Sequence, residues 1–189
     1  TELYEIAKRE GRLNIEKMIA ITNRVFDELK GKVSKHEEIR LAAFKRTLVE
    51  VGRPDDTLAT HLSEFYLRHR YNDIELFDDV LPTLKALKSR YKIGVVSNGN
   101  SYPNRCGLPD TFHYIVFSQD CGIEKPDPGI FHIAIEKAGC ASHEIMHVGD
   151  SLKNDVLGAA GAGMRSVWLN RQQTEADQAI NIDYEIQSL

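Results

Sequence analysis

The chain has 189 residues, of which 42% are hydrophobic and 28% are charged, and its formal net charge is −4. This length fits one large domain or one domain with an insertion, and the composition is that of a soluble globular protein. There is no basic excess to indicate nucleic-acid binding, and no apolar run approaches the ~18 residues of a membrane span. Three cysteines without Cys-x-x-Cys spacing argue against a disulfide framework or a zinc site and favour a cytoplasmic protein.

The first part of the chain, up to about residue 75, predicts helices only. Three segments have apolar residues at helical spacing, none alternates as a strand does, and a further short helix is expected before Gly11. The residues expected to open the three helices are Asn14, Ser34 in a capping box with Glu37, and Asp55 or Asp56; Gly31 and Gly52 are expected to end the first two.

From about residue 77 onward, short apolar runs alternate with helical segments. The expected strands are 92–97, 114–117, 145–148 and 165–169, with a weaker fifth at 182–185; the expected helices are 79–90, 127–139 and 156–163. Strands separated by helices predict βαβ units, a parallel sheet and the α/β fold class. In such sheets, ligands bind beyond the carboxyl ends of the strands.

Polar residues gather at these strand ends. Ser97 and Asn98 end the first run, Asp150 follows the third run, and Lys125 lies in the loop after the second. Asp155 stands five residues after Asp150, where a loop runs into a helix. A hydroxyl, an ammonium and the backbone N–H groups at 98–99 suit a phosphoryl group, while carboxylates suit a hard cation such as Mg²⁺.

Each of these residues also has an ordinary interpretation. A serine after a strand is often a helix cap, an exposed lysine is usually only solvated, and Asp150 fits a helix N-cap. The joint pattern of Ser97, Lys125, Asp150 and Asp155 is what favours a site.

Three segments carry a resemblance to a known family: Ile93–Gly99, Glu124–Phe131 and His147–Asp155. In residue order and spacing they resemble the haloacid dehalogenase superfamily of hydrolases, over roughly residues 77–185. The resemblance implies a Rossmannoid parallel sheet flanked by helices at 77–189, with a helical-bundle cap of the first type at 1–76. It does not indicate an oligomeric state.

The resemblance also implies a role for each candidate residue. Ser97 binds the transferring phosphoryl group with backbone help at Asn98, and Lys125 neutralises charge on the nucleophile and on the phosphoryl oxygens. Asp150 is the Mg²⁺ ligand, and Asp155 is the second acid, which holds the metal directly or through water. The implied activity is Mg²⁺-dependent hydrolysis of a small-molecule phosphomonoester through an aspartyl-phosphate intermediate.

The sequence departs from the family at its first motif, an apolar strand that ends in Asp-x-Asp-x-Thr and carries the nucleophile. Nothing before Ser97 fits, since the nearest segment, Arg53–Thr57, has an arginine in the nucleophile's place and predicts a helix cap. We therefore expect the nucleophile on an N-terminal segment missing from this chain, a gap in the middle of the sheet, and no catalysis by the chain as it stands.

Three other functions stay open. A 2-haloacid dehalogenase needs no metal, and the Gly149–Asp150 pair argues against it. A GDSL-type esterase would use Ser151 as nucleophile, but the only Asp-x-x-His of the chain, at 110–113, precedes that serine. The absent nucleophile also allows a non-catalytic binding protein of the same fold. The substrate is not predicted, although residues 102–105 are either leaving-group contacts or a plain turn.

Overall fold

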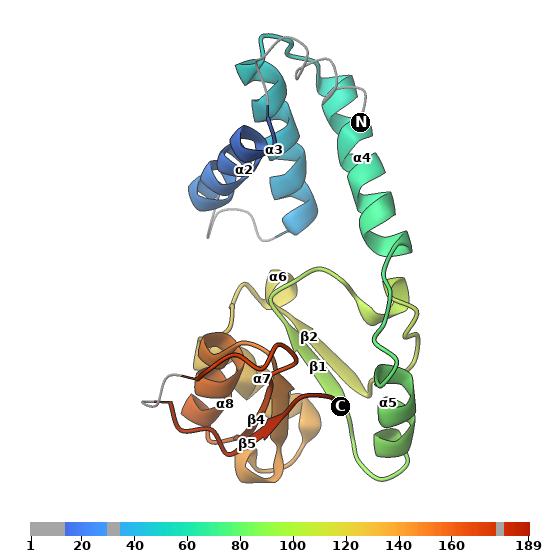
Figure 1. The fold of residues 1–189 in the computed structure, drawn as a ribbon, viewed down its shortest axis with the longest axis vertical. Coiled ribbons are helices and arrows are strands. Elements are labelled where there is room, and N and C mark those ends of the chain that lie inside the picture. Colours follow the sequence, from blue (N-terminus) through green and yellow to red (C-terminus); the bar gives the residue numbers. More distant parts are fainter. Residues whose placement is uncertain (1–13, 30–34, 177–179) are drawn as a thin grey trace. The chain divides into compact units, whose positions relative to one another are not determined.

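The computed structural model describes residues 14–29, 35–176 and 180–189. The chain divides into two compact units, Thr1–Asp73 and Ile74–Leu189 (Figure 1). In neither unit do the described residues form a helix long and apolar enough to cross a membrane. The short helix expected before Gly11, the stop at Gly31 and the cap at Ser34 lie outside the described residues.

The described residues of the first unit form helices, as the periodicity predicts. They are α2 (Ile15–Leu29), α3 (His36–Glu50) and α4 (Asp56–Asn72), with α3 packed against both of the others. The apolar faces of α2 and α3 meet in a core made by Ile21, Val25, Ile39, Ala43 and Val51. The helical spacing of these residues buries one stripe of each helix, and that burial stabilises the unit.

Two of the predicted helix caps are confirmed. The Asn14 Oδ1 atom accepts a hydrogen bond from the backbone N–H of Lys17 at 2.8 Å, and Asp55 Oδ1 accepts one from Leu58 N–H at 2.9 Å. Gly52 follows α3 with a φ of 76°, the left-handed conformation that often ends a helix. The segment with the arginine in the nucleophile's place is thus the start of α4, as its sequence predicts.

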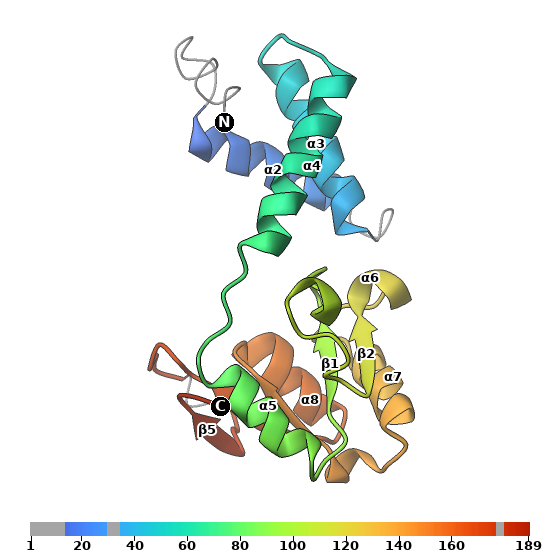
Figure 2. The same ribbon diagram turned by 90° about the vertical axis from the view of Figure 1, so that its right-hand side faces the viewer.

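The second unit has the predicted α/β order (Figures 1 and 2). Its main elements are α5 (Val80–Lys88), β1 (Gly94–Ser97), β2 (Tyr114–Phe117), α7 (Pro128–Ala138), β3 (Met146–Gly149), β4 (Arg165–Leu169) and β5 (Tyr184–Ile186). Shorter helical turns are η1 (Pro103–Arg105), α6 (Ser118–Cys121), η2 (Ser142–Glu144), the π-helix η3 (Leu152–Leu157) and α8 (Gly158–Gly161). All strand pairs are parallel, which confirms the fold class.

The parallel strands form two separate sheets, with orders β1-β2 and β3-β4-β5. Within the described residues, β1 pairs only with β2, and β3 pairs only with β4. The exposed fractions reflect this: Met146 and Val148 of β3 are 52% and 42% exposed, whereas Val167 and Trp168 of the central β4 are 5% and 3%. Within the described residues, the strands thus form two sheets in which β1 and β3 each have one paired edge.

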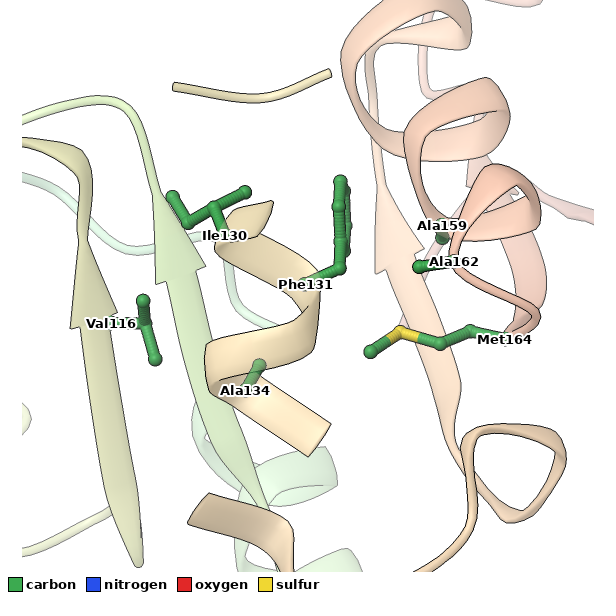
Figure 3. Packing of buried hydrophobic residues seen from close by; sticks show 7 residues of the cluster. All are labelled: Val116, Ile130, Phe131, Ala134, Ala159, Ala162 and Met164. Atoms are coloured by element: carbon green, nitrogen blue, oxygen red, sulfur yellow. The ribbon is translucent and has the colours of Figure 1, made fainter. Parts of the chain in front are cut away.

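Helix α7 joins the two sheets into one core. It contacts β1, β2 and α8, and Figure 3 shows Val116 of β2 on one side of the helix and the α8 region on the other. The cluster consists of Val116, Ile130, Phe131, Ala134, Ala159, Ala162 and Met164, all buried. This packing places the start of α7, and with it the preceding loop that carries Lys125, between the β1-β2 sheet and α8.

Candidate active site

The loop that carries Lys125 is tied to the carboxyl end of β1 by one side chain. Asn98 Nδ2 donates to the backbone carbonyl of Lys125 at 2.9 Å, and Asn98 Oδ1 accepts from the Lys125 backbone N–H at 2.7 Å. A primary amide that satisfies both polar groups of one residue fixes the position of that residue. Asn98 therefore acts here through its side chain, whereas the sequence analysis assigned it only a backbone role.

The Lys125 ammonium is held inside the protein. Its Nζ donates to the Val96 carbonyl oxygen at 3.1 Å and to Asp155 Oδ1 at 2.6 Å. The side chains of Lys125 and Asp155 are 12% and 6% exposed. The alternative that Lys125 is a solvated surface lysine is therefore wrong, and its charge lies at the strand end where the sequence places the site.

Asp155 is the centre of this network. Besides Lys125, His147 Nε2 lies 3.0 Å from the same Oδ1 atom, and the Ser151 backbone N–H donates to Oδ2 at 3.0 Å. Burial alone would raise the pKa of Asp155, but the hydrogen bonds from His147, Lys125 and Ser151 and the charge of Lys125 outweigh it and lower the pKa to about 2. The carboxylate is therefore ionised at neutral pH.

Local geometry brings Asp155 to this position. Ser151 caps η3 by accepting from the Asn154 N–H at 3.1 Å, so the alternative that Asp150 is the N-cap is wrong. At Gly149 an added Cβ would lie 2.2 Å from Asp155 Cγ, so only glycine leaves room for this carboxylate against β3. The predicted helix at 156–163 is correspondingly a π-helix that begins at Leu152, followed by the short α8.

The remaining predicted residues, Ser97 and Asp150, neighbour the network along the chain. Ser97 is half-buried, and its Oγ accepts from the Gly99 N–H at 3.0 Å, so that N–H does not face an anion. Asp150 is exposed, and its backbone carbonyl accepts from Trp168 Nε1 at 3.0 Å. Within the described residues, no group of three or more His, Cys, Asp or Glu side chains is arranged to hold a metal ion.

His147 is the residue of this cluster that the sequence analysis left without a role. Its side chain is 12% exposed, and its ring packs edge-on against Phe131, with 5.2 Å between ring centroids. The available signal was a histidine inside the predicted apolar strand 145–148, where a polar ring requires a partner. The identity of that partner depends on the fold.

Residues 102–105, the possible leaving-group contacts, line a pocket of about 480 Å³ with residues 108 and 110–115. The Tyr102 ring stacks on Phe117 at 4.1 Å, and its hydroxyl donates to Asp120 at 2.7 Å. Neither the predicted phosphoryl-binding residues nor the predicted metal ligands line this pocket. Residues 103–105 form the 3₁₀ turn η1, so their contact with a leaving group stays a prediction.

Comparison with known proteins identifies the family. The model of the haloacid dehalogenase-like hydrolases matches residues 5–163, so the chain belongs to this family. The structure is similar to the crystal structure of a 2-haloacid dehalogenase from Pseudomonas syringae. The similarity covers 98% of this chain and 82% of that chain, with a TM-score of 0.82 and 33% sequence identity.

Curated relatives include phosphatases. The chain is 30% identical to a glyceraldehyde 3-phosphate phosphatase of Methanopyrus kandleri over 84% of its own length and 71% of the relative's. It is 35% identical to a pyrimidine 5'-nucleotidase of Escherichia coli over 56% of its length and 50% of the relative's. The chain therefore spans between half and about seven-tenths of the length of these relatives.

Proposed function

We propose that this chain is the larger part of a Mg²⁺-dependent hydrolase of small phosphomonoesters. The observation that carries the proposal is the buried Lys125 ammonium at the end of β1, which donates to the Val96 carbonyl and to Asp155, while Asn98 holds the Lys125 backbone. A fixed positive charge in a site shielded from water stabilises negative charge that develops on a phosphoryl group. The similarity to named phosphatases supports this substrate class.

Each residue has a task in this proposal. Ser97 donates its hydroxyl hydrogen to a phosphoryl oxygen, and Lys125 neutralises charge on the phosphoryl oxygens and on the nucleophile. Asn98 positions the backbone of Lys125 through its two hydrogen bonds. The helical first unit is the cap that contributes to substrate choice, and we infer a reducing, cytoplasmic setting from the three cysteines, which show no Cys-x-x-Cys spacing.

Asp150 is the proposed direct ligand of Mg²⁺. Its carboxylate is exposed at the end of β3, and the described residues provide no hydrogen bond or ion pair to it, so its oxygens can face a cation. Asp155 already accepts three hydrogen bonds out of the about four that a carboxylate can take, and we assign it contact with the ion through water only. Bound Mg²⁺ supplies charge neutralisation at phosphoryl oxygens.

The nucleophile is proposed to be an aspartate on a strand outside these 189 residues. The two separate sheets support this, because β1 and β3 each have one strand partner among the described residues, and the residues of β3 that face outward are apolar and exposed. An added parallel strand would supply backbone partners to unpaired edges and bury Met146 and Val148. Such a strand can carry the family's Asp-x-Asp motif to the same edge as Ser97.

The decisive experiment compares this 189-residue chain with the protein extended by its own upstream residues. The extended form should release phosphate from a panel of sugar, nucleotide and polyol phosphates and from phosphoglycolate; EDTA should abolish turnover and Mg²⁺ should restore it. The shorter chain should release none. The extended form with its first motif aspartate changed to asparagine is the matched control. Robust phosphatase activity from a chain verified by mass to begin at Thr1 would refute the proposed mechanism.

A 2-haloacid dehalogenase is the second candidate, favoured by the similarity to the Pseudomonas syringae structure. The two candidates differ in their need for a metal. Halide release from 2-haloacids that is unaffected by EDTA, together with no phosphate release in Mg²⁺, would select the dehalogenase. Neither activity in the extended form would select a non-catalytic binding protein.

A further inference from the structure

In the second unit, one oxygen of the Asp155 carboxylate contacts two side chains, those of Lys125 and His147. Asp155 Oδ1 accepts from Lys125 Nζ at 2.6 Å and lies 3.0 Å from His147 Nε2, while Ser151 N–H holds Oδ2 at 3.0 Å. The ionised carboxylate can only accept, so the His147 Nε2 that faces it carries the hydrogen and donates. The orientation of the carboxylate is therefore fixed from three sides.

The imidazole of His147 is itself fixed by packing. Phe131 is fully buried, and its ring meets that of His147 at an interplanar angle of 87°. An added Cβ at Gly158 would lie 2.6 Å from the Phe131 ring, so the backbone at Gly158 lies close against the phenyl group and limits its movement. Strand β3 and helix α7 together hold the imidazole in one orientation.

We propose that His147 is a positioning residue for Lys125: its Nε2–H fixes the plane of the Asp155 carboxylate, and that plane fixes the ammonium. Without the donor, Oδ1 would be held by Lys125 alone. The carboxylate could then turn about Oδ2, which Ser151 N–H still holds, and the ammonium would keep only the Val96 carbonyl as a fixed partner. A displacement of about 1 Å in a catalytic charge is enough to lower the rate about a hundredfold. This role rests on the proposed function, in which Lys125 stabilises the transferring phosphoryl group.

The kinetic test uses two variants of the protein extended by its own upstream residues. His147→Gln keeps an N–H donor near the position of Nε2, and His147→Leu removes the donor at similar size. The leucine variant should lose about tenfold or more in kcat with little change in KM, and the glutamine variant should retain most of kcat. Equal loss in both variants, at equal free energies of unfolding, would overturn the proposal.

A second measurement follows Lys125 without reference to activity. Acetic anhydride at low concentration acetylates amines according to their exposure, and peptide mass spectrometry reports the rate at Lys125 against the exposed Lys137. His147→Leu should raise the rate at Lys125 severalfold and leave Lys137 unchanged, while His147→Gln should match the wild type. Met164→Ala, in the same core, is the control for general destabilisation and should not raise the rate at Lys125.

The two measurements separate the two proposals. If the extended protein lacks phosphatase activity, the proposed function fails, but the labelling still decides whether His147 positions the ammonium. Wild-type labelling of Lys125 in a folded leucine variant would overturn the positioning role. Should that variant not fold, His147→Ser, which also lacks a donor at this reach, is measured instead and carries the same two outcomes.

Discussion

The two acidic positions around η3 carry the same residue type in opposite environments. Asp155 as a whole residue is 4% exposed, and its carboxylate accepts three hydrogen bonds and has its pKa lowered to about 2. Asp150 is exposed, and its carboxylate has no such partner in the described part of the chain. The family resemblance implies that both aspartates hold one metal ion. In the structure, the Asp155 carboxylate binds groups of the protein itself, whereas the Asp150 carboxylate is open to a ligand. Substitutions around Asp155 should therefore affect stability, and substitution of Asp150 should affect activity alone.

The largest loss of stability should follow removal of the cation that faces Asp155. Lys125→Ala leaves a buried carboxylate without its charged partner, and we expect the free energy of unfolding to fall by about 3–5 kcal/mol. In the extended protein kcat should also fall, by about 10²–10³-fold. Urea denaturation and steady-state kinetics measure the two effects.

The control for this prediction is a second substitution, at the Asp155 end of the Lys125–Asp155 ion pair. Asp155→Asn in the Lys125→Ala background removes the unpaired charge, so the double variant should be more stable than the single lysine variant. Lys125→Arg should rescue only part of kcat, since a planar guanidinium does not reproduce a point charge. A single alanine variant as stable as the wild type would contradict the buried ion pair.

The second largest effect should be the dependence of the free energy of unfolding on pH that Asp155 causes. Its pKa is lowered from 3.8 to about 2 on folding, so the folded state favours the ionised form. The resulting stabilisation, about 2 kcal/mol, is fully present above pH ~4 and is lost as the pH falls through the folded pKa. Urea denaturation in EDTA between pH 5 and pH 2 should show this loss.

Asp155→Asn isolates that contribution. Asp79, whose pKa is lowered first by its hydrogen bond from Arg171, also titrates at low pH, but it does so in both proteins. The difference between wild type and variant should therefore shrink as the pH falls from 4 to 2. A difference that is constant over this range would mean that the Asp155 pKa is unperturbed by folding.

Local sequence was sufficient to predict most of the elements. The run at 114–117 is the strand β2, and the run at 165–169 is β4, with the same limits. Asn14 and Asp55 cap their helices because a cap depends only on residues one turn away.

The parts that could not be predicted depend on contacts between distant segments. The π-helix η3 starts four residues before the expected helix, with Asp155 of η3 bound to His147, Lys125 and the Ser151 N–H. The burial of Lys125 requires β1, the loop before α7 and η3 to meet, and no single segment encodes that meeting. The contact of His147 with Asp155 likewise requires β3 and η3 to meet.

A third aspartate, Asp55, should have a smaller effect on stability than Asp155. Asp55 is exposed like Asp150 but caps α4 through Leu58 N–H, so Asp55→Ala should cost about 1 kcal/mol of unfolding free energy. Asp55→Asn should cost little, because asparagine also caps. Asp56→Ala removes only an exposed ion pair with Lys45 and should change stability by less than about 0.5 kcal/mol. Thermal and urea denaturation would rank the three variants, and a harmless Asp55→Ala would contradict the cap.

Asp150→Asn should have the smallest effect on stability of all. Because Asp150 is exposed and Ser151 supplies the cap of η3, the amide replaces the carboxylate without loss of a contact, and we expect a change within about 0.5 kcal/mol. Turnover in Mg²⁺ should nonetheless be lost, since a neutral amide is a poor ligand for a hard cation. Calorimetric titration of Mg²⁺ into the extended protein and its variant, beside urea denaturation of both, measures the two quantities. Wild-type kinetics with wild-type stability would mean that Asp150 does not hold the metal, whereas a large loss of stability would mean that the open carboxylate is a structural residue like Asp155.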